Sequence, residues 1–576
     1  MNIKNFIPML GWVKNYGGTE LKGDLSAGLT VGVMLIPQGM AYAMIAGLPP
    51  IYGLYASTIP LILYAIFGTS RQLAVGPVAM VSLLTAAGIG ALADGGTETY
   101  IALAIALALM VGVIQFLLGV FRLGFLVNFL SHPVISGFTS AAALIIGLSQ
   151  LKHLLGVNIE RSHHVHEIII QAAEQFGAIN WVTFAVGVGG IAIIMGVKRI
   201  NKAIPGPLLA VLFGIMAVWG LGLTNSGVQI VGTVPEGLPS MVIPQVNMES
   251  MQSLLPIALT ISLVGFMESI AVAKAIQAKH RNYKVIPNQE LIGLGVANIG
   301  GAFFQSYPVT GGFSRTAVND QAGAKTGMAS IISAVLIILT LLFLTPLFYY
   351  LPKAILASVI MVAVFGLIDY KEAIHLWKSN RTDFVMLIVT FLATLSLGIE
   401  QGIGVGVILS LVMVIYRSTR PHYATLGRIP GTSFFRNTER FQELEERPDM
   451  LIFRFDADLY FANTNFFKEK LEEEAKAKGE ALKYIIIGAE SISYVDSSAL
   501  HALEEILEEY REQGVHVVFT GVKGPLRDAL NRAHLMDYFG ANNFYISIQE
   551  AVAQLSKEED PDATSSHKEY TLQTNL

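Results

Sequence analysis

The sequence predicts a helical membrane protein with many spans, followed by a soluble α/β domain. Of its 576 residues, 53% are hydrophobic and only 14% are charged, which is too apolar for a soluble protein of this size. Apolar runs long enough to cross a bilayer recur as far as about residue 417. After Arg420 the chain turns polar, with the alternating strand and helix patterns of a soluble domain.

Composition also excludes several functional classes. The net charge of −5 is small and the basic residues are spread between apolar runs, so we expect no nucleic-acid partner. The chain contains no cysteine, which excludes disulfides, thiol catalysis and Cys-based metal sites. The soluble part shows no catalytic constellation and no cofactor loop, so we expect neither an enzyme nor a bound cofactor.

Fourteen candidate spans follow from the criterion of about 20 mostly apolar residues. The clear ones lie near 24–45, 50–68, 99–121, 127–151, 179–197, 205–223, 254–273, 287–305, 328–350, 383–400 and 402–417. Three are shorter or broken, at 76–93, 314–325 and 352–368. We interpret the first run as a retained helix, because Pro37-Gln38 interrupts it and many spans follow. An even number of spans places both termini on the same side.

The distribution of Lys and Arg predicts which side that is. With a cytoplasmic N-terminus, the inside loops include the basic stretches 198–202, 274–284, 371–381 and 417–422. The long outside loop, Leu221 to Gln252, contains neither Lys nor Arg. We therefore expect both termini and the soluble domain to be cytoplasmic. The spans are expected to lie in a bacterial inner (plasma) membrane.

Two similar breaks indicate a duplication. "AVGPVAMVS" (Ala74 to Ser82) opens the third span of the first seven, and "GGFSRTAVN" (Gly311 to Asn319) opens the third span of the second seven. Because seven is odd, the two halves would cross the membrane in opposite directions, as an inverted repeat.

The breaks in the spans mark a cavity, because irregular backbone is tolerated in a bilayer only where protein or water covers it. Pro37 lies inside the first span, and Gln38 and Tyr42, four residues apart, share one helical face. Pro77 suits a helix start, and Ser314 can act as an N-cap. Two half-helix N-termini facing each other would offer free N–H groups and positive dipole ends to one anion.

Two isolated charges lie within the apolar spans. Arg315 would add a permanent positive charge to the anion site, or alternatively would reach the interface or neutralise a structural carboxylate. Glu268 could bind and release a coupling proton, or alternatively serve as a helix-packing carboxyl. Lys274 is predicted to lie at the interface. The His-rich stretch 161–167 lies in an outside loop and Glu400 in a solvated turn, so we predict no metal site.

The soluble part reads as an α/β domain. Strands are predicted from Met450, over Tyr484 to Ile492 and from Val515, and an amphipathic helix over Ser498 to Gly514. We expect a transmembrane domain over 1–425, this soluble domain over 436–556 and a polar, disordered tail over 557–576.

Five stretches carry a resemblance to a known family. They are "IPQGMAYAMIAGLPPIYGLYAS", "FGTSRQLAVGPVAMVSL", "FLSHPVISGFTSAAALIIGLSQL", "NQELIGLGVANIGGAFFQSYPVTGGFSRTAVN" and "VDSSAL". The chain resembles the sulfate permease family of anion transporters over nearly its whole length, and its soluble part resembles a STAS domain.

The resemblance implies a seven-plus-seven inverted repeat with a core of spans 1–4 and 8–11 and a gate of spans 5–7 and 12–14. It places a substrate site between the N-termini of spans three and ten, with Glu268 at the coupling position on span eight. Transport would be elevator-like, and assembly as a homodimer is common in the family. By motif position, the implied substrate-binding residues are Gln38, Tyr42, Val78, Gly312, Phe313, Ser314 and Arg315.

In the related anti-sigma-factor antagonists, a serine of an Asp-Ser-Ser-Gly motif is phosphorylated. This chain has "DSSA" (Asp496 to Ala499), so Ser497 and Ser498 are possible regulatory sites, and we favour an N-cap role for one of them.

We expect a secondary transporter of sulfate coupled to protons. The alternatives left open are a sodium-coupled bicarbonate transporter, an anion exchanger or channel of the same fold, and a membrane-anchored signalling protein.

Overall fold

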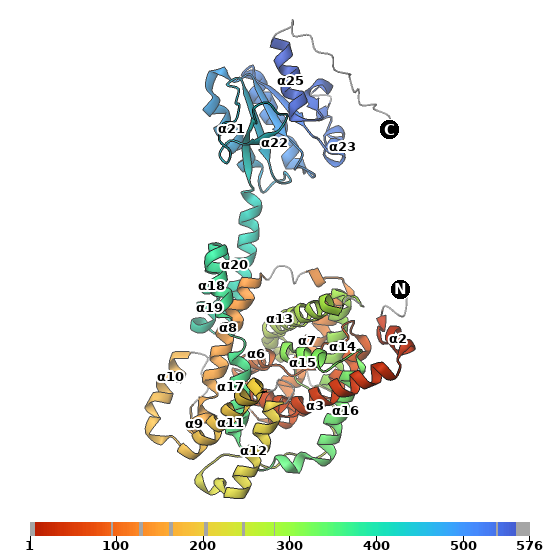
Figure 1. The fold of residues 1–576 in the computed structure, drawn as a ribbon, viewed down its shortest axis with the longest axis vertical. Helices are drawn as coiled ribbons and strands as arrows, with labels where there is room; N and C mark the ends of the chain where they lie inside the picture. Colours follow the sequence, from red (N-terminus) through yellow and green to blue (C-terminus); the bar gives the residue numbers. More distant parts are fainter. Residues whose placement is uncertain are drawn as a thin grey trace. The chain divides into compact units, whose positions relative to one another are not determined.

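The computed structural model describes residues 6–93, 96–125, 131–159, 165–200, 205–244, 248–280, 283–536 and 540–559. The chain forms two compact units, Met1–Ser410 and Leu411–Leu576, and each is described by itself (Figure 1). Residues 560–576 of the expected tail and 160–164 of the His-rich stretch lie outside the described residues.

Each of the fourteen predicted spans corresponds to helix in the structure. The first seven are α3 Gly18–Ile45, α4 Ile51–Tyr55 with α5 Ile59–Phe67, α6 Ala79–Gly90, α7 Glu98–Val120, α8 His132–Ser149, α11 Trp181–Ile200 and α12 Gly206–Leu221. The second seven are α13 Met248–His280, α14 Pro287–Phe303, α15 Phe313–Gln321, α16 Met328–Phe343, α17 Lys353–Phe365, α19 Arg381–Leu397 and α20 Ile399–Thr419. Further short helices are α2 Met9–Trp12, α9 Leu151–Leu155, α10 Val165–Glu174 and α18 Tyr370–Ser379.

Length and composition alone identify only half of these helices as spans. Among the described residues, 7 helical stretches are long and apolar enough to cross a membrane unaided. The half-helices α6 and α15 are too short for this, at 12 and 9 residues. Such short helices are stable at membrane depth only where neighbouring protein covers their ends.

The packing of the helices has the symmetry of an inverted repeat. α16 packs on α3, and the equivalent helices in the other half, α7 and α13, also pack on each other. Likewise, α14 packs on α7, and their equivalents, α5 and α16, are in contact. In each comparison the two pairs are related by a shift of seven spans. In the same way, α8 packs on α19 as α17 packs on α11. The first group of helices is the predicted core and the second belongs to the predicted gate.

Close helix crossings in the core depend on glycine. A Cβ added to Gly112 of α7 would lie 2.6 Å from the backbone nitrogen of Ile299 on α14, and one on Gly295 would lie 2.6 Å from that of Phe116. Because lipid supplies no hydrophobic force between helices, such close backbone contact is what holds spans together. The glycines thus allow α7 and α14 to pack directly against each other.

The soluble unit is a six-stranded sheet covered on both faces. Its strand order is β4-β3-β5-β6-β7-β8, with β5 to β8 parallel and β3 antiparallel to β5. Phe453, Phe455 and Ile487 lie in one core with helices α21 and α22, whereas Ile452, Ile486 and Val518 lie in a second core with α25. Alternate strand residues therefore face opposite layers.

The elements of this unit have the following bounds. The strands are β3 Tyr423–Arg428, β4 Phe435–Asn437, β5 Met450–Phe455, β6 Tyr484–Gly488, β7 His516–Thr520 and β8 Phe544–Tyr545, and the helices are α21 Thr464–Lys478, α22 Ser497–Glu512, α23 Gly524–Arg532 and α25 Ile548–Glu559.

Candidate functional site

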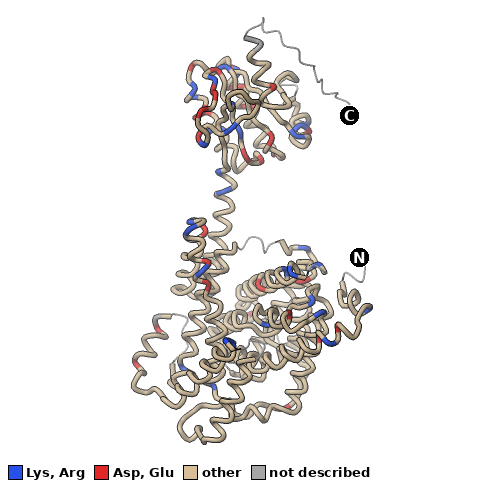
Figure 2. The backbone as a smooth tube through the Cα atoms, in the orientation of Figure 1, with Lys and Arg blue, Asp and Glu red and all other residues tan. Residues whose placement is uncertain are grey.

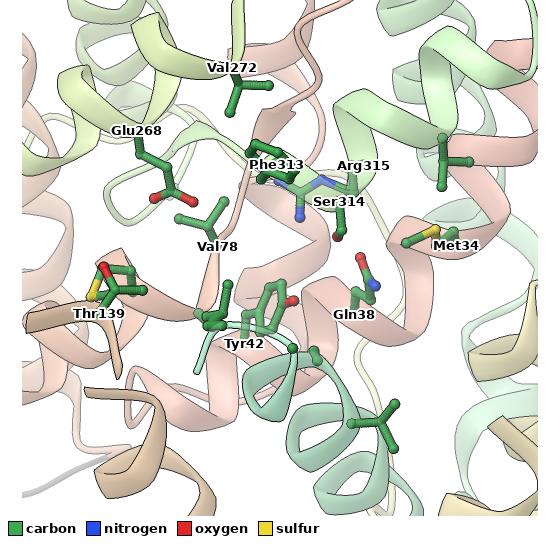
Figure 3. Close-up of a pocket in the computed structure, with 18 of the residues that line it drawn as sticks. Met34, Gln38, Tyr42, Val78, Thr139, Glu268, Val272, Phe313, Ser314 and Arg315 are labelled. Atoms are coloured by element: carbon green, nitrogen blue, oxygen red, sulfur yellow. The ribbon is translucent and has the colours of Figure 1, made fainter. Parts of the chain in front are cut away.

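A cavity of about 700 Å³ lies inside the membrane unit. It is lined by every residue that the sequence motifs assigned to substrate binding or coupling. These are Gln38, Tyr42, Val78, Glu268, Gly312, Phe313, Ser314 and Arg315. Figure 3 shows that these side chains come from α3, α6, α13 and α15 and that several of them point toward a common space. Residues far apart in the sequence are thus brought together by the fold.

The two half-helices begin at the same place. β1 (Val75–Gly76) pairs antiparallel with β2 (Thr310–Gly311), with Val75 opposite Gly311, and α6 and α15 start directly afterwards. The N-cap residues are Val78 and Gly312, and a Cβ added to Gly312 would lie 3.2 Å from Val78 Cγ1. The positive ends of two helix dipoles therefore meet beside the cavity.

Neither N-terminus is capped by a side chain. The first N–H groups of α6, at Ala79, Met80 and Val81, have no hydrogen-bond acceptor among the described residues. The same holds for Phe313, Ser314 and Arg315 of α15. Unpaired N–H groups at a helix start are donors for an anion. The predicted N-cap role of Ser314 is wrong, because glycine at position 312 takes the extended N-cap conformation two residues earlier.

Arg315 is the central charge of the site. Its side chain is 1% exposed, and Nη1 donates to the Pro77 carbonyl oxygen over 2.5 Å. Nε and Nη2 are buried without a hydrogen-bond partner. Arg315 does not reach the surface, and it forms no ion pair within 4.0 Å with the described residues. Two of the three guanidinium nitrogens are therefore left without a partner in the protein.

Glycine beside Arg315 leaves room for the guanidinium group. A Cβ added to Gly312 would lie 3.0 Å from Nη2, and one on Gly76 would lie 3.4 Å from the same atom. Gly76 also has a φ of +149°, which other residues rarely adopt. The backbone of both half-helix entrances thus packs directly against the arginine.

Glu268 lies on α13 and lines the same cavity. Among the described residues it forms no ion pair and no hydrogen bond of its side chain. The helix-packing contact is made by the next residue, Ser269, whose Oγ lies 2.7 Å from Thr310 Oγ1 and accepts from the Gly311 N–H over 2.8 Å. Figure 3 shows the Glu268 carboxylate directed toward Val78. Glu268 is thus a carboxyl in the cavity without a hydrogen-bond or ion-pair partner among the described residues.

Gln38 and Tyr42 lie on one face of α3, which continues through Pro37 without a break. Their side chains are buried, and Gln38 Oε1 has no hydrogen-bond partner. Figure 3 shows Ser314 directed toward Gln38, with Tyr42 on the adjacent turn. The basic residues His132 and Lys198 also line the cavity, so basic groups outnumber the single carboxylate there.

Several residues that sequence reasoning missed hold this arrangement. Asn298 on α14 donates to the Val309 carbonyl and accepts from the Val309 N–H, which secures the segment before β2. Thr316 Oγ1 accepts from the Ala74 N–H, which joins the two half-helix entrances. Glu290 is fully buried and accepts hydrogen bonds from Tyr64 Oη, Thr69 Oγ1 and the Ser70 N–H. A lone polar residue in an apolar run is the signal that could have revealed Asn298, whereas Glu290 follows Asn288 and Gln289 and carries no such signal.

In the soluble unit, neither of the two predicted serines is the N-cap of α22. Ser497 and Ser498 are exposed and form the first two positions of α22. The N-cap is Asp496, whose Oδ1 accepts from the Ala499 N–H over 2.9 Å and whose Oδ2 accepts from the Phe461 N–H. The predicted N-cap role of the serines is therefore wrong, because the carboxylate already occupies it.

Other sequence-based candidates contribute nothing to the site. Lys274 is exposed on α13, and the side chain of Glu400 lies outside the described residues. Within the part of the chain that the structure describes, no group of His, Asp and Glu is placed to hold a metal ion.

Comparison with known proteins agrees with this architecture. Residues 21–390 match the model of the Sulfate permease family, and residues 441–551 match the STAS domain. Sulfate transporter 4.1, chloroplastic, of Arabidopsis thaliana is 41% identical over 573 residues, covering 96% of this chain and 82% of that protein. Sulfate transporter 2.1 of the same plant is 37% identical over 575 residues, covering 96% and 85%.

Solved structures give the same result. The murine Solute Carrier 26 family member A9 anion transporter, in the inward-facing state, superposes with a TM-score of 0.89 at 25% identity, covering 96% of this chain and 94% of that one. The transmembrane domain of the cyanobacterium bicarbonate transporter BicA shares the fold, with a TM-score of 0.60 at 23% identity, covering 69% and 98%. The plant relatives lend no support to the expected bacterial inner membrane.

Proposed function

The chain belongs to the sulfate permease family of anion transporters, and from that membership we propose that it is a secondary transporter that carries sulfate together with protons. The observation that carries the proposal is Arg315, buried where two uncapped half-helices begin, with two unpartnered guanidinium nitrogens beside the cavity. The relatives that are 41% and 37% identical are named sulfate transporters, which favours sulfate among the anions.

The chemistry of the site suits a fully ionised tetrahedral oxyanion. The free N–H groups of α6, α15 and Arg315 are all donors, and sulfate at neutral pH offers only acceptors. A permanent guanidinium charge and two helix dipoles together offset the loss of water around a divalent anion. Gln38, Tyr42 and Ser314 would complete the polar lining.

Glu268 supplies the coupling. An ionised carboxylate in the same cavity repels an incoming dianion, whereas the protonated form does not. Sulfate and a proton on Glu268 would therefore favour each other's binding, which is the thermodynamic condition for symport.

The movement we propose is an elevator. The site residues belong to core helices, while Phe138 of α8, Val359 of α17 and Ile403 of α20 border the same cavity from the gate. Displacement of the core along the gate would carry the anion from one side of the membrane to the other. By similarity to the murine transporter, we propose that this structure is inward-facing, with its cavity open toward the cytoplasm.

We further propose that both termini and the STAS domain are cytoplasmic, and that the chain forms a homodimer. The proposed domain limits are 1–425, 436–556 and 557–576. The structure separates the two compact units within α20, after Ser410.

The test is uptake of radiolabelled sulfate into proteoliposomes that contain the purified full chain, with a proton gradient, a sodium gradient or neither. We expect concentrative uptake only with the proton gradient, and competition by selenate. Sodium-dependent bicarbonate uptake without sulfate uptake would replace both the substrate and the coupling ion. If sulfate uptake never exceeds equilibrium under any gradient, symport is excluded and the protein is an exchanger or channel.

A further inference from the structure

The short helix α18 (Tyr370–Ser379) connects two gate helices, α17 and α19, and is not a span (Figure 1). It packs on α19 and is tied to α8 at its start. The Asp369 N–H donates to Ser140 Oγ over 3.2 Å, and Glu372 Oε1 lies 3.4 Å from His132 Nδ1. The orientation of α18 on the gate is therefore set by specific contacts.

One face of α18 is apolar and uncovered. Tyr370, Ile374 and Trp377 are 63%, 52% and 55% exposed. Their spacing of four and three residues places them in one stripe along the helix. Leu376, on the face toward the protein, is only 7% exposed. The helix thus buries one side and presents three large apolar side chains on another.

Basic residues border this stripe. At 100° per residue, Lys371 and Lys378 lie about 90° around the helix from the stripe. Both are exposed, and among the described residues neither forms an ion pair. The Arg381 guanidinium carbon lies 5.6 Å from the centre of the Trp377 ring. The tube coloured by charge shows Lys and Arg together with Asp and Glu where α18 lies (Figure 2).

Two acidic residues at the start of α18 have partners within the protein. Asp369 caps α18 by accepting from the Glu372 N–H over 3.0 Å, and the Glu372 side chain faces His132 of α8. The two carboxylates lie at the start of α18, whereas the exposed charged side chains that border the stripe along the helix are Lys371 and Lys378.

The stripe continues into the lipid-facing surface of a span. Trp377 packs against Phe384 of α19 with ring centres 5.0 Å apart. Farther along α19, Val385 and Leu392 are 56% and 55% exposed. Because α19 crosses the bilayer, the apolar surface of α18 adjoins lipid at the level where that span begins.

We propose that α18 lies in the plane of the cytoplasmic membrane surface and binds anionic lipid headgroups. Tyr370, Ile374 and Trp377 would insert below the headgroups, and Lys371 and Lys378 would contact lipid phosphates. Aromatic rings prefer the interface, and basic residues beside an apolar stripe are typical of helices that lie on anionic bilayers. By its contacts with α8 and α19, α18 would hold the gate at a set depth. The cytoplasmic assignment rests on the proposed orientation.

The placement can be measured without any transport assay. The natural chain has no cysteine, so Ile374→Cys and Ser379→Cys each provide a single site for a nitroxide label. In bilayers, we expect the label at position 374 to collide more with oxygen than with a water-soluble nickel complex, and the label at 379 to do the reverse. Equal access of nickel to both positions would refute insertion. Protection of position 374 from both reagents would also refute it, by showing that protein, such as a second copy, covers the stripe.

The lipid charge is tested separately. In neutral detergent, a fluorophore at Ile374→Cys reports titration with short-chain phosphatidylglycerol. Each lysine removed should weaken binding about fivefold, so Lys371→Gln with Lys378→Gln should weaken it about 25-fold. The matched control is Lys476→Gln with Lys523→Gln in the soluble unit, which should leave the titration unchanged. Equal affinity of the α18 variant and the control would refute headgroup binding. Both measurements remain informative if sulfate is not the substrate.

Discussion

At the scale of single residues, the site is defined by donors that the protein leaves unpaired. A buried arginine normally uses its N–H groups within the protein, because an unpaired buried charge is costly. Arg315 Nη1 donates to the Pro77 carbonyl, whereas Nε and Nη2 have no partner in the protein. Those free donors, and those of two helix starts, are the basis of the proposed binding of an acceptor-rich anion.

Replacing Arg315 tests that reasoning. We expect Arg315→Ala to weaken sulfate binding roughly 10- to 100-fold, since a hydrogen bond to a charged group contributes about 1.5–3 kcal/mol. Arg315→Lys should recover only part of the affinity, because a lysine cannot bond Pro77 and present a planar pair of donors together. Isothermal titration calorimetry of each purified variant with sulfate measures both affinities. Lys274→Ala, an exposed cation on α13, is the control, and an unchanged affinity of Arg315→Ala would remove Arg315 from the site.

Replacing Glu268 tests the coupling. Glu268→Gln mimics the protonated carboxyl and cannot release a proton, so proton-driven accumulation of sulfate should be lost while exchange of internal for external sulfate continues. Glu249→Gln, at the exposed start of the same helix, should behave as the natural protein. Uptake by Glu268→Gln that keeps its full pH dependence would contradict the assignment.

At the scale of elements, helix packing depends on glycines at crossings. Gly39 of α3 and Gly53 of α4 face each other so closely that a Cβ on Gly53 would lie 1.9 Å from the Gly39 carbonyl oxygen. α3 carries Gln38 and Tyr42, so this crossing also positions part of the cavity lining.

We therefore expect Gly53→Ala to destabilise the membrane unit by about 3 kcal/mol or more, because backbone rather than a movable side chain must shift. Gly189→Ala on α11, where an added Cβ meets nothing within 4 Å, should be neutral or slightly stabilising. The midpoints of thermal unfolding of the two variants in detergent, monitored by the exposure of engineered cysteines, provide the comparison. Equal midpoints would show that α3 and α4 separate without cost.

At the scale of the whole molecule, the chain combines two units stabilised by different interactions. The membrane unit relies on close backbone contact and buried polar bonds, whereas the soluble unit has an apolar core on each side of its sheet. Partly exposed ion pairs flank the interior strand β5 of that sheet. In one of them, burial raises the pKa of Asp456, but hydrogen bonds from Arg454 and His422 outweigh this and lower it.

The soluble unit should therefore lose stability in acid. The Arg447 side chain likewise lowers the pKa of Asp449. A carboxyl whose folded pKa is lowered stabilises the fold above its unfolded pKa, near 3.9, and loses that effect as the pH falls through the folded value. Each contributes on the order of 1 kcal/mol. Hydrogen exchange of β5 to β7 in the full chain, corrected for intrinsic rates, should accelerate below about pH 4.

The variant Asp456→Asn reports on this pair directly. It should reduce the acid dependence of exchange, whereas Asp528→Asn, at an exposed position of α23, should leave it unchanged. An acid response that is identical in the Asp456→Asn and natural proteins would exclude the Asp456 contribution.

The sequence by itself determined the spans, the two half-helix positions and the two isolated charges, because a bilayer penalises polar groups locally and each exception is visible in the letters. Only the tertiary structure decided which residues cap the helices, namely Gly312 rather than Ser314 and Asp496 rather than the serines after it. It also decided that Arg315 bonds Pro77 and that Asn298 secures the segment before β2. A helix cap depends on the dihedral angles of one residue. The bonds of Arg315 and Asn298 join segments that only the packing of the helices brings together. Hydrophobic periodicity encodes neither the caps nor these bonds.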